Sequence, residues 1–386
     1  MDGGFTILAP SNAAFENIPN TVMSSVWNAN DTKVTVPLML YHVLSTQLSM
    51  ATLPSDQVHA TTLLTDPAWT TLAGGQGVLI NRQPGNLVVF VSGGGARSLL
   101  KAVDIPFKGG LIQVIDNLLV PPGPLNATLE DFQDLSFLGA LYAAGLYDQV
   151  ANNNGTNGTM AGGAGGGNYT FFAPSVPGLQ VVNGTLSNLT TAQLRRVMQY
   201  HIVPSAVLPS TSLENGTHYT TLLGASGPAL HVHRSGNNLY VNSAQVIQSD
   251  ILLENGILHI LDNVLNPDVP DAAPNSNGTA AQMPVFSGAV NASTMVVTDL
   301  PFTTALPCTA SCSVLTMATT VSASAGNSSS SFVMSAATSA NGTKSSTATD
   351  LATSSSKAGA AVLPRCKGLG VLGAMGLGAV GLVLEL

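Results

Sequence analysis

The spacing of the histidines is the first feature of this chain that could indicate a chemical function. Of the seven histidines, His231 and His233 are two residues apart, so on a strand they would share one face. Together with His218 or His259 they could bind a metal ion. No cysteine or carboxylate lies near the pair in the sequence to complete such a site. We therefore expect exposed strand residues and no metal.

The dipeptide Tyr-His occurs twice, as Tyr41-His42 and as Tyr200-His201. In both places the histidine lies on the apolar face of a predicted helix. The simplest interpretation is a core histidine that hydrogen-bonds to the backbone and fixes its helix.

No motif of the common enzyme classes occurs in the sequence. The nucleophile elbow Gly-x-Ser-x-Gly, the zinc motif His-Glu-x-x-His and a phosphate-binding loop are all missing. Asp116 and Asp262 each follow an apolar strand and precede Asn, so we expect them to cap turns by accepting backbone N–H bonds. A carboxylate pair of the glycosidase type stays open, because no spacing selects one. We predict a non-catalytic protein without a cofactor.

The elements that must position these residues are repeated along the chain. Four sequence blocks occur twice in the same order, and a period of about 150 residues is too long for a solenoid unit. The chain is therefore predicted to contain two tandem globular domains, 1–122 and 123–267. The blocks begin at Phe5, Leu40, His59 and Gly110, and again at Thr170, Gln199, His218 and Gly256.

Helices are predicted early in each copy and strands late, which is the α+β pattern. In the second copy, apolar residues at helical spacing predict a helix over 129–147, with Thr128 and Asp131 as its capping pair. Two apolar runs around Ser235 to Asn238 predict a hairpin. The runs around Pro84 to Asn86 predict its counterpart in the first copy.

A second capping box is formed by Thr190 and Gln193. The apolar face that follows extends to Ile202, and Pro204 should stop the helix.

The ordered blocks resemble the fasciclin (FAS1) domain family. That family opens with Thr-hydrophobic-Phe-Ala-Pro-x-Asn/Asp-x-Ala-Phe, has a central Tyr-His pair, and closes with Gly-x-hydrophobic-His and, further on, Asp-x-hydrophobic-Leu-x-Pro. The resemblance covers roughly residues 1–267 and implies a compact α+β wedge for each copy. The opening block reads Phe5 to Phe15 and, less completely, Phe171 to Val176; the closing block reads Gly110 to Pro121 and Gly256 to Pro267.

The first copy departs from the family pattern in three ways. Leu8 stands where the family has Phe, and Gln113 replaces the His that His259 keeps in the second copy. No counterpart of the predicted 129–147 helix precedes Phe5. We therefore expect the natural N-terminus to lie upstream of Met1.

The resemblance also implies candidate binding residues. In animal members of the family, the region around Tyr-His and an Asp-Ile element near the closing block are implicated in integrin binding. The stalk and anchor described below are typical of a fungal protein, so we carry over the surface and leave its ligand as a cell-surface or matrix glycan or protein. The implied residues are Tyr41, His42, Tyr200, His201, Asp104, Ile105, Asp250 and Ile251.

The charge of the chain excludes nucleic acid as a partner. The formal net charge is −8 and only 8% of residues are charged, so no basic patch exists to neutralise phosphates. A chain with so little charge needs another hydrating group, and the density of Asn-x-Ser/Thr acceptors predicts a secreted glycoprotein. These acceptors are Asn30, Asn126, Asn154, Asn157, Asn168, Asn183, Asn188, Asn215, Asn277, Asn291, Asn327 and Asn341.

The C-terminal third has a different composition. Residues 268–357 are rich in Pro, Ser and Thr and predict a glycosylated stalk that cannot bury a core. Residues 358–386 are apolar and predict a lipid-anchor (GPI) signal, with Ser356 or Gly359 as the attachment site; a retained membrane span is the alternative. Cys308 and Cys312 could form a disulfide or stay reduced.

Taken together, these features predict a cell-surface glycoprotein held at the plasma membrane or cell wall. Its expected role is adhesion, or organisation of the wall or matrix. A structural wall glycoprotein without a specific ligand and an enzyme acting on wall polysaccharide are the alternatives.

Overall fold

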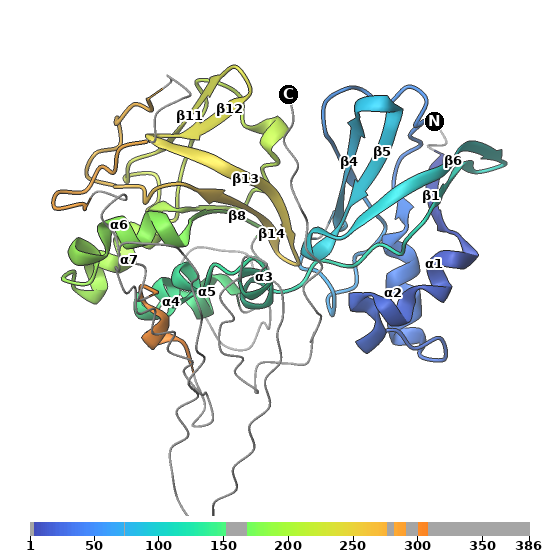
Figure 1. Ribbon diagram of the computed structural model, residues 1–386, viewed down its shortest axis with the longest axis horizontal. Coiled ribbons are helices and arrows are strands. Elements are labelled where there is room, and N and C mark those ends of the chain that lie inside the picture. The colour runs from blue at the N-terminus through green and yellow to red at the C-terminus, as the bar shows by residue number, and fades with distance from the viewer. Residues whose placement is uncertain (1–3, 73, 152–167, 276–281, 291–299, 308–386) are drawn as a thin grey trace, which may run out of the picture. The chain divides into compact units, whose positions relative to one another are not determined.

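The computed structural model describes residues 4–72, 74–151, 168–275, 282–290 and 300–307 (Figure 1). Two seven-stranded sheets contain the strands, one in each predicted copy. The predicted α+β class and the tandem arrangement are thus confirmed. The elements of copy one are β1 (Phe5–Pro10), α1 (Asn12–Glu16), α2 (Thr32–Tyr41), β2 (Val43–Leu44), β3 (Val58–Thr61), β4 (Gly77–Gln83), β5 (Leu87–Val91), β6 (Arg97–Phe107) and β7 (Gly110–Ile115).

Copy two repeats this arrangement and adds helices before its first strand. Its elements are α3 (Leu125–Asp131), α4 (Leu135–Ala143), α5 (Tyr147–Ala151), β8 (Tyr169–Pro174), α6 (Val176–Leu186), α7 (Thr191–Tyr200), β9 (Ile202–Pro204), β10 (His218–Tyr219), β11 (Leu230–Ser235), β12 (Asn238–Val241), β13 (Ala244–Leu253) and β14 (Gly256–Leu261).

The two sheets have the same strand order. In copy one the order is β2-β1-β7-β6-β5-β4-β3, and in copy two it is β9-β8-β14-β13-β12-β11-β10. The opening and closing blocks of each repeat lie side by side, because β1 pairs with β7 and β8 with β14 in parallel. All other strand pairs are antiparallel.

The closing blocks begin with a glycine because two backbones meet there. Gly110 has a φ of 152° and Gly256 a φ of 155°. A Cβ atom on Gly110 would lie 1.8 Å from the carbonyl oxygen of Phe5, and one on Gly256 would lie 1.9 Å from that of Tyr169. Only glycine allows the two parallel strands to approach at these points.

Both predicted hairpins are confirmed. In the pairing of β11 with β12, Val232 lies opposite Val241 and Ser235 lies opposite Asn238, which leaves a two-residue turn. β4 pairs with β5 around the short 3-10 turn Pro84–Asn86.

The single helix predicted over 129–147 is wrong. The segment forms three helices, because Gln133 and Gly145 have φ values of 59° and interrupt the helical path. Thr128 lies buried inside α3 and does not cap it. Asp134 caps α4 instead, and its side chain accepts a hydrogen bond from the N–H of Phe137.

The helix that follows Thr190 is confirmed at its start and corrected at its end. Thr190 and Gln193 form the predicted capping box of α7. The helix ends at Tyr200, before the predicted stop at Pro204, because the backbone from Ile202 onward pairs with β8 as strand β9.

Part of the predicted stalk belongs to copy two. Val285 accepts a hydrogen bond from the side chain of Asn266, and Val290 donates its N–H to the carbonyl of Val181. Phe286 and Phe302 pack against the core cluster that contains α4. The stalk boundary at residue 268 is therefore too early. Residues 308–386, with the possible Cys308–Cys312 disulfide and the anchor signal, lie outside the described residues.

Candidate functional site

The two Tyr-His pairs lie in the cores of their copies. Tyr41, Tyr200 and His201 are fully buried, and His42 is 2% exposed. The Tyr41 hydroxyl donates a hydrogen bond to the carbonyl of Gly77 at 2.9 Å. The Tyr200 hydroxyl does the same to Ala229, also at 2.9 Å, and accepts one from Asn242. Each tyrosine therefore ties the end of its helix to the sheet.

Each histidine joins the helix before it to the closing block of its copy. In copy one, His42 Nδ1 lies 2.8 Å from the Leu38 carbonyl, and Nε2 accepts the N–H of Leu119 at 2.9 Å. In copy two, His201 makes the same bonds, to the Val197 carbonyl and from the Leu265 N–H.

These bonds fix both imidazoles as neutral rings with the proton on Nδ1. Nδ1 faces a carbonyl and must donate, whereas Nε2 faces an N–H and must accept. Burial lowers the pKa of His42 and of His201 to about 4, and the hydrogen bond to the backbone carbonyl offsets this only in part. Both histidines are thus buried and hydrogen-bonded to the backbone, as expected for core histidines. A binding role for the four Tyr-His side chains stays a prediction. Because these side chains are buried, they could contribute to binding only by supporting the surface above them.

Asp104 organises a loop of copy one. Its carboxylate accepts hydrogen bonds from the N–H groups of Met50 and Ala51 at 3.0 and 3.1 Å and from the Ser49 hydroxyl at 2.6 Å. Burial alone would raise the pKa of this carboxyl, but the hydrogen bonds, including one from Gln113, outweigh it and hold the pKa below its usual value.

Asp250 has the same role in copy two. It accepts the N–H of Ser210 at 2.7 Å and the hydroxyls of Ser210 and Ser249. Burial opposes ionisation here too, but neighbouring His259 and the serine hydrogen bonds hold the pKa of the carboxyl below its usual value. Asp104 and Asp250 have left-handed φ values of 53° and 64°, a conformation that Asp tolerates better than most residues.

Gln113 replaces a histidine without losing its hydrogen bonds. His259 Nδ1 accepts the N–H of Asp250 at 3.2 Å, and Nε2 contacts the Leu208 carbonyl at 2.9 Å. Gln113 accepts the N–H of Asp104 at 2.8 Å and donates to the Leu48 carbonyl at 3.3 Å. The sequence revealed the exchange, but only the fold shows that both side chains accept the N–H of the aspartate at a strand irregularity.

We expect Asp250→Ala to destabilise copy two by about 2–4 kcal/mol. The substitution leaves the N–H of Ser210 without its partner and places Ala in a left-handed conformation. The matched variant Asp104→Ala should cost less, because Asp104 is half-exposed and water can replace its carboxylate, whereas Asp250 is buried. Urea unfolding of both variants measures the difference. Equal losses would show that burial does not control how much each aspartate contributes to stability.

The isoleucines of the two Asp-Ile elements have different surroundings. Ile105 is 42% exposed, whereas Ile251 is 4% exposed and belongs to the core of copy two. The two Asp-Ile elements match in sequence and in strand register. The difference in exposure between Ile105 and Ile251 therefore comes from what covers each sheet.

The prediction that Asp116 and Asp262 accept backbone N–H bonds is confirmed, but these bonds run to a neighbouring strand and do not cap a turn. Asp116 accepts the N–H of Leu99 at 2.7 Å, and Asp262 accepts that of Gln245 at 2.8 Å. The two carboxylates therefore tie the end of β7 to β6 and the end of β14 to β13.

Two of the histidines on β10 and β11 lie in contact. The rings of His218 and His231 meet edge to face with centroids 4.2 Å apart, and His231 and His233 are half-buried where we expected exposure. His259 is engaged with Asp250 and Leu208. The described residues contain no group of three or more His, Cys, Asp or Glu that could hold a metal ion.

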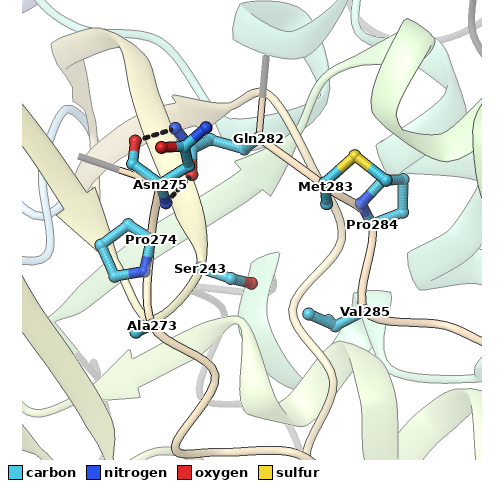
Figure 2. Close-up of a pocket in the computed structure, with 8 residues that line it drawn as sticks. All are labelled: Ser243, Ala273, Pro274, Asn275, Gln282, Met283, Pro284 and Val285. Carbon is cyan, nitrogen blue, oxygen red and sulfur yellow. Dashed lines mark hydrogen bonds between the residues drawn. The ribbon is translucent and has the colours of Figure 1, made fainter. Parts of the chain in front are cut away.

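Two small pockets lie on copy two. The first has a volume of about 270 Å³, and in Figure 2 the Asn275–Gln282 pair closes one side of it while Met283 and Pro284 stand opposite. Gln282 accepts the N–H of Asn275 at 2.7 Å and returns a hydrogen bond to its carbonyl at 2.8 Å. The pocket's lining residues are Ser243, Ala273, Pro274, Asn275, Gln282, Met283, Pro284 and Val285. Sequence reasoning missed this site, because it assigned residues beyond 267 to the stalk.

The second pocket, of about 420 Å³, has one ion pair at its wall. Arg196 contacts Asp268 at 2.6 Å, and Asp268 is the one carboxylate that lines the pocket. The described residues that line the two pockets do not include the two facing carboxylates that glycoside hydrolysis requires.

The acceptor asparagines differ in accessibility. Asn30, Asn188 and Asn215 are exposed, whereas Asn126, Asn168 and Asn183 are half-buried. Occupancy of all of them stays a prediction. The other six, Asn154, Asn157, Asn277, Asn291, Asn327 and Asn341, lie outside the described residues.

No helix within the described ranges has the length and apolar character needed to cross a membrane.

Comparison with known proteins places these features in a family. The family model described as "Fasciclin domain" matches residues 1–121 and 135–267. A fasciclin-like arabinogalactan protein of Arthroderma benhamiae is 30% identical over 299 residues, which are 76% of this chain and 66% of that protein. The fasciclin-like arabinogalactan protein elcF of Phaeosphaeria nodorum is 24% identical over 68% of this chain and 78% of its own length.

Among solved structures, the chain is similar to a FAS1 domain pair from the insect cell adhesion molecule Fasciclin I. The identity is 16%, the TM-score is 0.34, and the match covers 70% of this chain and 90% of that one. The two family matches span both sheets, and each contains the Tyr-His pair, the hydrogen-bonded aspartate (Asp104 or Asp250) and the glycine-led closing strand described above. The chain therefore belongs to the fasciclin domain family.

Proposed function

We propose that this chain is a cell-surface glycoprotein whose tandem fasciclin domains act in adhesion, or in organising the cell wall or extracellular matrix, without catalysis. Its ligand is a glycan or protein of the cell surface or matrix. Two similar domains on one chain allow weak contacts to add by avidity.

The observation that carries this proposal is that the polar residues shared by both copies form hydrogen bonds within the protein. The imidazoles of His42 and His201 and the carboxylates of Asp104 and Asp250 are all bonded to backbone or to neighbouring side chains. Groups bound in this way stabilise a scaffold and are poorly placed to act on a substrate. A binding module agrees with this arrangement better than an enzyme does.

The relatives support a place at the cell surface. Both fungal proteins reported above are named fasciclin-like arabinogalactan proteins, and arabinogalactan is a carbohydrate. We propose the same for this chain, with the Ser/Thr-rich segment as a stalk and a lipid anchor attached at Ser356 or Gly359. The net charge of −8 agrees with a partner that is not nucleic acid.

An adhesion assay on the full protein tests the proposal. Protein released from cells by phosphatidylinositol-specific phospholipase C is coated on beads, and adhesion to cells and matrix is measured with and without soluble protein as competitor. We expect the lipase to release the protein and the soluble form to inhibit bead adhesion. Beads that carry only the released glycans serve as the control.

The alternatives give other results. Adhesion no greater than that of the glycan beads would favour a structural wall glycoprotein. Turnover of wall polysaccharide that a carboxylate substitution abolishes would favour an enzyme. Retention on cells after lipase treatment would favour a membrane span over an anchor.

A further inference from the structure

The second pocket of copy two has an apolar floor and a mainly polar rim. Its volume of about 420 Å³ lies within the range of small-molecule sites. The lining residues that form the floor are apolar and buried or half-buried, and they are Leu189, Val197, Val285 and Phe286. The lining residues that form the rim are exposed, and they are Gln193, Arg196, Asp268, Val269 and Ser287. A ligand that fits both parts needs an apolar surface and hydrogen-bonding groups along its edge.

Two further lining residues hold the wall of this pocket in place. The Thr185 hydroxyl donates a hydrogen bond to the carbonyl of Ser287 at 2.7 Å. The Asn266 side chain donates to the Val285 carbonyl at 3.1 Å and accepts the N–H of Asp268 at 2.9 Å. The segment after β14 is thus bonded to itself and to α6, so the pocket is formed before any ligand binds.

The rim side chains have hydrogen-bonding capacity to spare. Arg196 Nη1 contacts Asp268 Oδ1 at 2.6 Å, and no other described residue bonds to the remaining guanidinium N–H groups or to Asp268 Oδ2. Gln193 Oε1 accepts the N–H and the hydroxyl of Thr190, whereas none of the described residues accepts a bond from its side-chain amide nitrogen. The rim therefore presents donors and acceptors together, with one positive and one negative charge.

The fasciclin fold does not require the ion pair at this rim. Arg196 lies four residues before Tyr200, and the residue four before Tyr41 in copy one is Pro37. Asp268 follows the proline that ends its closing block, and in copy one Pro122 has that position. The side chains of the pair are 44% and 72% exposed, so their contact adds little to stability. The polar rim is thus specific to copy two.

We infer that the second pocket binds one pyranose sugar unit of a neutral glycan. A pyranose ring has an apolar C–H face that fits the floor, and its hydroxyl groups donate and accept hydrogen bonds as the rim requires. An entirely apolar ligand would leave the rim groups without partners, and the two opposite charges of the rim favour an uncharged ligand. The inference rests on the proposed function, whose ligand it narrows from a glycan or protein to a neutral glycan.

Saturation-transfer NMR on the full-length protein tests this site. The probes are the methyl glycosides of glucose, galactose, mannose and N-acetylglucosamine. We expect saturable binding of at least one probe, with the strongest transfer to the C–H protons of one ring face. Arg196→Gln should lower the affinity by about tenfold or more, because hydrogen bonds to charged groups are the strong ones. The control Arg97→Gln alters an exposed arginine of copy one and should bind as the wild type does.

A second pair of variants tests the apolar contact. Val269 is 44% exposed and lines the pocket, whereas Val290 is 51% exposed and does not line it. Val269→Ser should weaken sugar binding by about fivefold, because apolar contact area is lost, and Val290→Ser should leave it unchanged. Urea unfolding verifies that all four variants are folded, as expected for substitutions at exposed positions.

The source of the sugar is separated by repeating the titration after enzymatic removal of N-glycans. The acceptors Asn183 and Asn188 lie within two residues of the lining residues Thr185 and Leu189. Binding that appears only after this treatment would support the sugar site and make the chain's own glycan its occupant. Equal binding before and after would support the site and make an external glycan the occupant.

Two results would overturn the inference. They are no saturable binding of any probe in either form, and equal affinity of Arg196→Gln and Arg97→Gln. Bead adhesion separates this outcome from failure of the proposed function. A protein that binds sugar at this pocket but does not adhere would refute adhesion and leave the sugar site standing. A protein that adheres but binds no sugar would refute the sugar site alone.

Discussion

Replacing Tyr200 by Ala is expected to destabilise copy two by about 3–5 kcal/mol, the range found for large aromatic side chains removed from protein cores. The ring is fully buried among residues of β11 and β12. Its hydroxyl also bonds to the Ala229 carbonyl and the Asn242 side chain, so the substitution leaves polar groups unpaired as well. Since whole domains are stable by about 5–15 kcal/mol, such a loss would remove a large fraction of the stability of copy two.

Two comparisons make this result interpretable. Tyr200→Phe keeps the ring and removes only the hydroxyl, so it should cost about 1–3 kcal/mol. Tryptophan fluorescence should report an intact copy one in both variants, while circular dichroism reports the loss in copy two. A Tyr200→Ala protein that melts normally but no longer adheres would contradict the core assignment and place this residue on a binding surface.

Acidification from pH 6.5 to pH 4 is expected to remove about 3 kcal/mol of stability for each of His42 and His201. Folding lowers the pKa of both from 6.5 to about 4, so the unfolded chain takes up protons first as the pH falls. Their contribution is therefore complete above about pH 6.5 and is lost by about pH 4. The structural reason is that a protonated ring can no longer accept the N–H of Leu119 or Leu265.

The measurement must isolate the histidines, because other groups act in the opposite direction. Burial raises the pKa of Asp134 and of Glu254 to about 7, so these carboxyls favour the folded state on acidification. The difference in unfolding free energy between the wild type and His201→Gln should shrink by about 3 kcal/mol over this pH range. His218→Gln, at an exposed position, is the control and should follow the wild type. Parallel curves for the wild type and His201→Gln would refute the prediction.

Local signals in the sequence were sufficient for the repeat, the fold class and several elements. The capping box at Thr190 and the turns at Pro84 and Gly236 depend on residues within a few positions of each other, so pattern reasoning could find them. The closing-block glycines were equally visible, because a glycine-led strand recurs at the same place in both copies. The prediction of one helix over 129–147 was wrong because the apolar spacing continues through Gln133. The spacing does not reveal that the backbone of Gln133 is left-handed.

The sequence by itself determined that two fasciclin domains follow one another, and it located the two hairpins and the start of α7. Only the tertiary structure decided what the candidate residues do. His201 receives its hydrogen bond from Leu265, 64 positions away, and Asp250 receives one from Ser210, 40 positions away. The matched residues Ile105 and Ile251 differ in exposure because helices cover one sheet and no described helix covers the other. Burial and long-range hydrogen bonds are properties of packed segments, so residue type and spacing could nominate these side chains but could not show whether they face solvent or the core.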